Sequence, residues 1–355
     1  MNFISAIDRF TGYGITSYNI FEQLYDMDKD LALHLIANPN LEESWNAKKI
    51  FNAVHNRSKF NKDQPCFKLW QQNELFLRTV GNSKYGALSF FELDTVLPVE
   101  RACYESLDLI FTPSSWGKEV LENNNIKTPI IVCPQGVDMR IFYPEEKPAD
   151  KPEETYTFIN IGKWEIRKGH DMLIEIFNKA FEKTDSVELW MVNNNPFLTP
   201  EQHAEWQAFY KDTKLGDKIR FFPRLDTQKI LAHVIKYADC GIFPSRAEGW
   251  NNEAIEIMAM DKPLIITNYS AHKQYCNKDN SYLIDITQTE SADDGVWFKG
   301  DGNWASLNTE AIDQAVEHMR YVHKNKIRSN PQGLITAKEH TWEKAAKTIY
   351  DNMVK

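Results

Sequence analysis

The feature that most constrains this chain is the alternation of short apolar runs with helix-patterned segments in its second half. Thr155–Ile161 (TYTFINI) is rich in β-forming residues, and apolar residues then recur at helical spacing between Leu173 and Phe181. Such alternation predicts βαβ units, and hence a parallel sheet covered by helices on both faces. Further strands are predicted at Ser186–Val192, Lys218–Phe222, Cys240–Phe243 and Pro263–Thr267, with helices at Ile230–Tyr237 and Asn252–Met260.

A proline-rich stretch, Tyr143–Thr155 (YPEEKPADKPEET), interrupts the chain. Its three prolines stand among charged residues with no apolar face, and proline at that density is excluded from helix and sheet interiors. A chain of 355 residues is also too long for one ordinary domain. We therefore predict a Rossmann-like domain over 1–147, a second Rossmann-like domain over 148–337, and a final helix over 338–355 that could pack back on the first domain.

The two halves resemble each other at one point. Ser106–Glu119 (SLDLIFTPSSWGKE) and Tyr237–Asn251 (YADCGIFPSRAEGWN) both contain an Asp, an apolar strand, and Pro-Ser opening a turn into a helix. This order suits a strand-to-helix turn at the carboxyl edge of a parallel sheet. We predict an α/β protein of two doubly wound domains that face each other across a cleft, although the similarity of the two segments could be chance.

Composition excludes several classes of protein. The net charge of −9 comes without a long basic run, which disfavours a nucleic-acid-binding surface. The five cysteines are widely spaced without a CxxC pair, which favours reduced thiols over a disulfide framework or zinc. No apolar stretch approaches the roughly 20 residues that span a bilayer. With no secretory pattern at the N-terminus, we expect a cytoplasmic protein, and peripheral membrane contact stays open.

The stronger of two motifs is Pro244–Met260 (PSRAEGWNNEAIEIMAM), which combines two carboxylates with a helix start. Glu248 lies in a loop after a predicted strand, and Glu256 lies one turn inside the next helix. Asn251 or Asn252 suits the N-cap, so the helix amides and the positive dipole end can hold an anion such as a diphosphate. The alternative is that both glutamates are solvated surface acids, although the apolar neighbours of Glu256 favour its burial.

The second motif is Gly162–Gly169 (GKWEIRKG), between a predicted strand and a helix. Lys163 and Lys168 then stand at the carboxyl edge of the sheet. Two ammonium groups near a helix N-terminus suit a diphosphate that must be held while its bond to a sugar breaks. The alternative is an ordinary charged surface loop.

Together the two motifs resemble one family, the retaining glycosyltransferases of the GT-B fold in the large group called family 4 (glycosyl transferases group 1). The glutamates Glu248 and Glu256, with seven residues between them, match its glutamate pair, and Gly162–Gly169 matches its Gly-Lys/Arg…Lys-Gly turn. Met260–Thr267 (MDKPLIIT) and Cys133–Pro144 (CPQGVDMRIFYP) resemble further family segments. The resemblance covers most of residues 104–275 in the correct order.

The resemblance implies a role for each matching residue. Lys163 and Lys168 would bind the donor diphosphate and help the leaving group to depart, and Glu248 would contact the donor sugar. These three are our candidate catalytic residues. The candidate donor-binding residues are Gly12, Gly14, Gly162, Arg224, Gly249, Trp250, Asn251 and Glu256, with Glu256 on the ribose and Arg224 beside the base.

The N-terminal half departs from the family pattern. Gly12-Tyr13-Gly14 is a short version of the glycine loop that faces the donor phosphates, and a simple tight turn is the alternative. The family histidine that lines the donor sugar has no clear equivalent, since His34 and His55 are candidates by residue type alone. The resemblance implies that no metal or cofactor is needed.

The function that follows is transfer of a sugar from a nucleotide-diphosphate sugar donor, by a hexosyltransferase-type enzyme (EC 2.4), with retention of anomeric configuration. The acceptor, which could be a glycan, a lipid-linked molecule or a protein, has no motif to identify it. The alternatives are a nucleotide-sugar 2-epimerase-like enzyme, a phage-type DNA glucosyltransferase and a non-catalytic sugar-nucleotide-binding protein. The acidic charge disfavours the second of these, and the intact phosphate and ribose motifs disfavour the third.

Overall fold

A computed structural model describes the chain except for residues 60, 77–82, 147, 149, 151 and 355. It divides into two compact units, Met1–Gly136 with His340–Lys355, and Val137–Glu339. The predicted boundary residue 147 lies outside the described residues. The division falls earlier, after Gly136, and the proline-rich stretch lies within the second unit. There Lys236 pairs with Glu145 at 2.5 Å, so this irregular segment is attached to the second unit.

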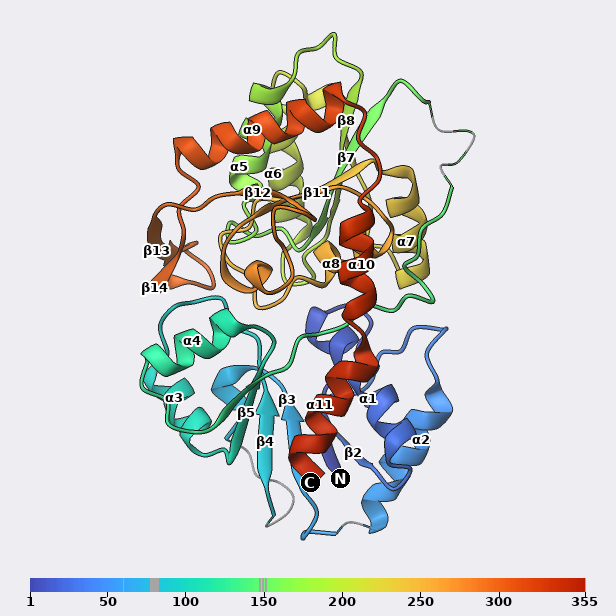
Figure 1. Ribbon diagram of the computed structural model, residues 1–355, viewed down its shortest axis with the longest axis vertical. Helices are drawn as coiled ribbons and strands as arrows, with labels where there is room; N and C mark the ends of the chain where they lie inside the picture. Colours follow the sequence, from blue (N-terminus) through green and yellow to red (C-terminus); the bar gives the residue numbers. More distant parts are fainter. Residues whose placement is uncertain (60, 77–82, 147, 149, 151, 355) are drawn as a thin grey trace. The chain divides into compact units, whose positions relative to one another are not determined.

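The first unit is built on one parallel sheet of six strands, in the order β2-β1-β3-β4-β5-β6. The chain begins and ends in this unit, because the final helix α11 packs against α1 (Figure 1). Its strands are β1 (Asn2–Ser5), β2 (Ala32–Leu35), β3 (Cys66–Leu69), β4 (Tyr85–Leu88), β5 (Leu109–Thr112) and β6 (Ile130–Val132). Its helices are α1 (Gly12–Met27), α2 (Ala47–Asn56), α3 (Pro98–Glu105), α4 (Ser115–Asn123) and α11 (Trp342–Val354).

The second unit holds another parallel sheet of six strands, in the order β12-β11-β10-β7-β8-β9, and a separate β13–β14 hairpin. Its strands are β7 (Tyr156–Gly162), β8 (Val187–Asn193), β9 (Ile219–Phe221), β10 (Cys240–Phe243), β11 (Leu264–Thr267), β12 (Tyr282–Ile284), β13 (Thr289–Asp293) and β14 (Lys299–Ala305). Its helices are α5 (His170–Ala180), α6 (Pro200–Lys211), α7 (Gln228–Tyr237), α8 (Asn252–Ala259), α9 (Thr309–Lys324) and α10 (Pro331–Glu339).

The strand order of the second unit reverses between β7 and β10. β7 starts a run that continues outward through β8 and β9, whereas β10 starts a run in the other direction through β11 and β12. This is the strand order of the dinucleotide-binding fold, in which ligands bind outside the carboxyl ends of the strands where the order reverses. The loops that follow β7 and β10 are the two predicted motifs, Gly162–Gly169 and Pro244–Asn251. The fold therefore brings the two motifs together at the sheet edge where proteins of this strand order bind ligands.

The two sheets and their helices confirm the predicted α/β class, and most predicted strands and helices are present within a residue or two. The antiparallel hairpin β13–β14 was not predicted, because its strands lack the long apolar runs that marked the others. Within the described residues, no helix is long and apolar enough to cross a membrane.

Candidate functional site

The loop after β7 places Lys168 against the sheet. Gly162 has a φ of +142°, and a Cβ atom there would lie 2.9 Å from Cδ of Lys168. Gly169 has a φ of +74°, and its Cβ would lie 2.0 Å from the carbonyl oxygen of Pro244. Both glycines are needed because a side chain at either position would displace the lysine or separate this loop from the loop after β10.

Glu248 lies at the centre of a buried ion cluster. Its carboxylate accepts hydrogen bonds from Nζ of Lys168 at 2.9 Å, from Nη1 of Arg167 at 2.9 Å and from Oγ of Ser245 at 3.0 Å. Although burial opposes ionisation, Arg167 and Lys168 hold the pKa of Glu248 well below its usual range. Glu248 is therefore ionised, and its carboxylate is oriented before any ligand binds.

Arg167 connects this cluster to Lys163. Its Nη2 donates to Glu165 at 2.6 Å, and Glu165 in turn pairs with Nζ of Lys163 at 2.7 Å. Despite burial, Arg167 and Lys163 lower the pKa of Glu165 to about 2. The order of charges is Lys163, Glu165, Arg167, Glu248, Lys168, so each predicted lysine is paired with a carboxylate and one guanidinium joins the two carboxylates.

The start of α8 is formed as expected. Asn251 is the N-cap, with a φ of +79°, and its Oδ1 accepts from the amide of Ala254 at 3.3 Å. Its Nδ2 lies 3.0 Å from Nε2 of His272, a buried imidazole whose Nδ1 is 3.0 Å from the Thr267 carbonyl oxygen. Burial lowers the pKa of His272 to about 4, so the ring is neutral and can accept from Asn251. The strained N-cap is thus held from the segment after β11.

Glu256 is buried one turn into α8. Burial, with a smaller contribution from Glu253, raises its pKa well above the usual range. In the part of the chain that the structure describes, its carboxyl group has no hydrogen-bond partner. The carboxyl group of Glu256 is therefore available for a ligand hydroxyl.

The remaining predicted donor residues lie in several segments. Gly249 and Trp250 follow Glu248, and the buried Trp250 ring packs against Tyr275 with centroids 4.8 Å apart. Arg224 is half-buried in the loop after β9. Gly12 and Gly14 belong to the first turn of α1 in the first unit.

Only one of the two glycines in the first turn of α1 is needed for local packing. The helix begins at the N-cap Thr11, which Asp8 holds through its backbone amide at 2.8 Å and its hydroxyl at 2.7 Å. A Cβ atom on Gly14 would lie 2.2 Å from the Asp8 carbonyl oxygen, whereas one on Gly12 would meet nothing within 4 Å. A phosphate-binding role for either glycine stays a prediction.

We expect Gly14→Ala to destabilise the protein by about 1–3 kcal/mol, because the methyl group overlaps backbone. Gly12→Ala is the matched control, and we expect its stability to be unchanged or up to about 1 kcal/mol higher, since alanine restricts the unfolded chain. Urea unfolding of both variants checks this. Equal losses of stability would contradict the packing difference.

The two candidate histidines of the first unit are not placed alike. His34 lies inside β2 with Nε2 3.4 Å from Oδ1 of Asn2, and burial lowers its pKa to about 4. His55 is exposed in the last turn of α2. Neither position follows the carboxyl end of a strand.

Three of the residues that organise the site were not predicted. Arg167 and Glu165 lie inside the motif Gly162–Gly169, where the alternation of basic and acidic residues was the available signal. Arg246 is the third. Its guanidinium binds Asp171 of α5 at 2.7 and 2.9 Å, Glu290 of β13 at 2.8 Å and the Ile166 carbonyl oxygen at 2.6 Å. No local pattern marks these partners, because they are distant in sequence.

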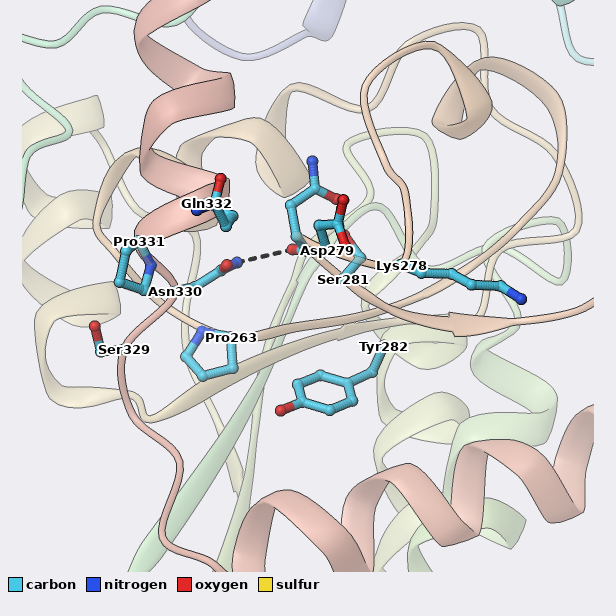
Figure 2. Close-up of a pocket in the computed structure, with 10 residues that line it drawn as sticks. Pro263, Lys278, Asp279, Ser281, Tyr282, Ser329, Asn330, Pro331 and Gln332 are labelled. Atoms are coloured by element: carbon cyan, nitrogen blue, oxygen red, sulfur yellow. Dashed lines mark hydrogen bonds between the residues drawn. The ribbon is translucent and has the colours of Figure 1, made fainter.

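A pocket of about 240 Å³ lies elsewhere in the second unit. Figure 2 shows its lining, in which Nδ2 of Asn330 donates to the Asn280 carbonyl oxygen at 2.9 Å. Pro263 and Ser281 line it just before β11 and β12 begin. The pocket is therefore at the amino ends of these strands, opposite the edge that carries the ion cluster, and it contains none of the predicted site residues.

Known proteins resemble this chain in sequence and in fold. Residues 155–295 match the family model described as "Glycosyl transferases group 1". The chain is 22% identical over 262 residues to an uncharacterized glycosyltransferase of Methanocaldococcus jannaschii. The matched region covers 71% of this chain and 59% of the relative. The chain thus spans less than two thirds of that relative's length.

Solved structures share the fold along the whole chain. Sucrose-phosphate synthase from Thermosynechococcus elongatus has a TM-score of 0.75 at 15% identity, covering 99% of this chain and 97% of the other. A glycosyltransferase from Rickettsia africae ESF-5 has a TM-score of 0.69 at 15% identity, covering 100% and 98%. The chain therefore has the GT-B fold of two Rossmann-like domains, and its segment 155–295 carries the signature of the group 1 glycosyltransferases.

Proposed function

We propose that the protein is a glycosyltransferase that moves a sugar, of hexosyl type, from a nucleotide-diphosphate sugar to an acceptor, with retention of anomeric configuration. One observation supports this above the others. The group 1 segment brings the Lys168–Glu248–Arg167 cluster to the carboxyl ends of β7 and β10, where its strand order reverses. That position is the ligand site of doubly wound sheets. One solved structure of similar fold is described as "Trehalose-6-phosphate from E. coli bound with UDP-2-fluoro glucose".

In the proposed complex, each predicted residue acts through chemistry that its surroundings allow. Lys163 and Lys168 bind the diphosphate and stabilise the negative charge that develops as the sugar leaves. Glu248 is already ionised and accepts hydrogen bonds from sugar hydroxyls. Glu256 accepts a hydrogen bond from the ribose diol. The leaving diphosphate then takes the proton of the attacking acceptor hydroxyl, so no enzymic nucleophile is required.

A thermal-shift screen against a panel of nucleotide sugars tests the donor site. The correct donor should stabilise the protein by about 2.7 kcal/mol at a hundred times its Kd. The anomeric configuration of the product, measured by NMR with that donor, then tests retention. Absence of stabilisation by every nucleotide sugar and nucleoside diphosphate would contradict the donor site, whereas an inverted product would contradict only the mechanism. Conversion of the donor without an acceptor would instead indicate an epimerase.

The burial of Glu256 predicts an unusual pH dependence for Glu256→Gln. The pKa of Glu256 in the folded protein lies above its ordinary value of 4.5. At a pH between 4.5 and this raised pKa, Glu256 is ionised in the unfolded chain but keeps its proton in the folded one. Wild-type stability therefore falls as pH rises through this range, and glutamine removes that loss. We expect Glu256→Gln to be as stable as the wild type at pH 4 and more stable at pH 7, by urea unfolding.

The exposed Glu119, in the middle of α4, supplies a matched control. Glu119→Gln should show the same stability difference from the wild type at both pH values. A Glu256→Gln variant that loses stability relative to the wild type between pH 4 and pH 7 would contradict a raised pKa.

A further inference from the structure

The β13–β14 hairpin is attached firmly to the loops of the donor site. Oε1 of Glu290, in β13, accepts from Nε of Arg246 at 2.8 Å, and Oε2 accepts from Oγ of Ser306 at 3.0 Å. The amide of Ala305, at the end of β14, donates to the Arg246 carbonyl oxygen at 3.0 Å. Since Arg246 also binds Asp171 and the loop after β7, the base of the hairpin cannot move independently of that loop.

The tip of the hairpin is ordered and yet exposes a tryptophan. Oδ1 of Asp294 accepts from the amides of Val296, Trp297 and Phe298, at 2.9, 2.7 and 2.9 Å. Trp297 nevertheless remains 56% exposed and Val296 57% exposed. The turn therefore presents a large aromatic ring to solvent from a hydrogen-bonded backbone.

The exposed tryptophan reaches the donor site through one other ring. Trp297 packs edge-on against Phe197, in the loop after β8, with centroids 5.8 Å apart. Nζ of Lys163 lies over the Phe197 ring, 5.5 Å from its centroid, and also pairs with Glu165 at 2.7 Å. The Lys163 ammonium therefore contacts both a carboxylate and an aromatic ring.

We propose that Phe197 and Trp297 are positioning residues for Lys163, which makes the β13–β14 hairpin a working part of the donor site. Lysine has a long flexible side chain, and ordering it on binding costs conformational entropy. A ring that already holds the ammonium reduces this cost when the diphosphate arrives. Trp297 acts one step further away, by keeping the Phe197 ring in place. The inference rests on the proposed diphosphate role of Lys163.

The contact itself can be tested without any activity. Reductive ¹³C-dimethylation keeps the lysine charge, and the Lys163 methyl resonance is assigned as the one missing from Lys163→Arg. We expect a ring-current shift of this resonance that is lost in Phe197→Leu, reduced in Trp297→Ala and restored in Phe197→Trp. Val296→Ala, in the same turn, is the control and should leave it unchanged. An unchanged Lys163 resonance in Phe197→Leu would overturn the proposal.

Titration with inorganic pyrophosphate, read on the same resonance, tests the consequence for binding. We expect the Kd to rise about two- to fivefold in Phe197→Leu, as expected for an exposed cation–π contact. The Kd should rise less in Trp297→Ala and stay constant in Val296→Ala. A wild-type protein whose Lys163 signal ignores pyrophosphate would overturn the diphosphate site and the positioning role together. A responding wild type with the same Kd in Phe197→Leu would overturn the positioning role alone.

Discussion

Lys168→Ala is expected to reduce donor turnover by more than about 100-fold, because one preorganised cation is lost where leaving-group charge develops. The substitution should also lower the free energy of unfolding by about 3 kcal/mol, since it removes one partner of a buried ion pair. Arg167 and Ser245 still contact Glu248 and limit this loss. Activity is therefore measured well below the variant's own Tm, with chemical unfolding as the stability measurement.

Lys163→Ala separates the effect on turnover from the effect on stability. The Lys163 side chain is 38% exposed, and its partner Glu165 retains the guanidinium of Arg167. We expect this variant to lose activity while its stability stays within about 1 kcal/mol of the wild type, as for other exposed ion pairs.

Near wild-type transfer by Lys168→Ala would show that the donor site has been assigned wrongly.

Arg167→Ala should be the most destabilising change in the site, at about 3–5 kcal/mol, because it leaves two buried carboxylates without their shared cation. Nη1 of Arg167 also donates to the Ala247 carbonyl oxygen at 2.7 Å, and the substitution removes this hydrogen bond. Arg167→Lys should recover part of the loss, since one ammonium cannot reproduce the geometry of a guanidinium that bridges Glu165 and Glu248.

The pH dependence identifies the source of this loss. Glu165 has a folded-state pKa of about 2, below its ordinary 4.5, so its contribution is present above pH 4.5 and disappears as pH falls toward 2. In Arg167→Ala the pKa of Glu165 should rise, because the cation that lowers it is removed. The free energy of unfolding should then depend less on pH between 4.5 and 2. Unfolding curves across this range measure it.

A surface arginine provides the control for Arg167. Arg220 is 60% exposed and pairs with Glu188 at 2.6 Å, so Arg220→Ala should change stability by less than about 1 kcal/mol. If both arginine variants lost the same small amount, the cluster around Glu248 would contribute no more than a surface pair.

Local patterns were enough to predict many elements of the second unit. Cys240–Phe243 was predicted as a strand and is β10 with the same bounds, and Asn252–Met260 is α8 with one residue less. Asn251 is the N-cap, as one of two candidates. These features depend on neighbours within a few residues, since strand length, helical periodicity and capping are local properties. The domain boundary was less accurate, because proline marks irregular backbone and not the unit against which that backbone packs.

The sequence by itself determined that parallel βαβ units form and that two charged motifs follow strands. These two motifs contain the predicted catalytic residues. Only the tertiary structure decided what these motifs contact. β10 lies beside β7, with Cys240 opposite Phe158, although 81 residues separate Arg167 from Glu248 in the chain. This neighbour relation pairs Glu248 with Arg167 and Lys168, and it also brings Arg246 to Glu290 of the hairpin. The physical reason is that strand order and register set which side chains meet at a sheet edge, and both are long-range properties that no local pattern encodes.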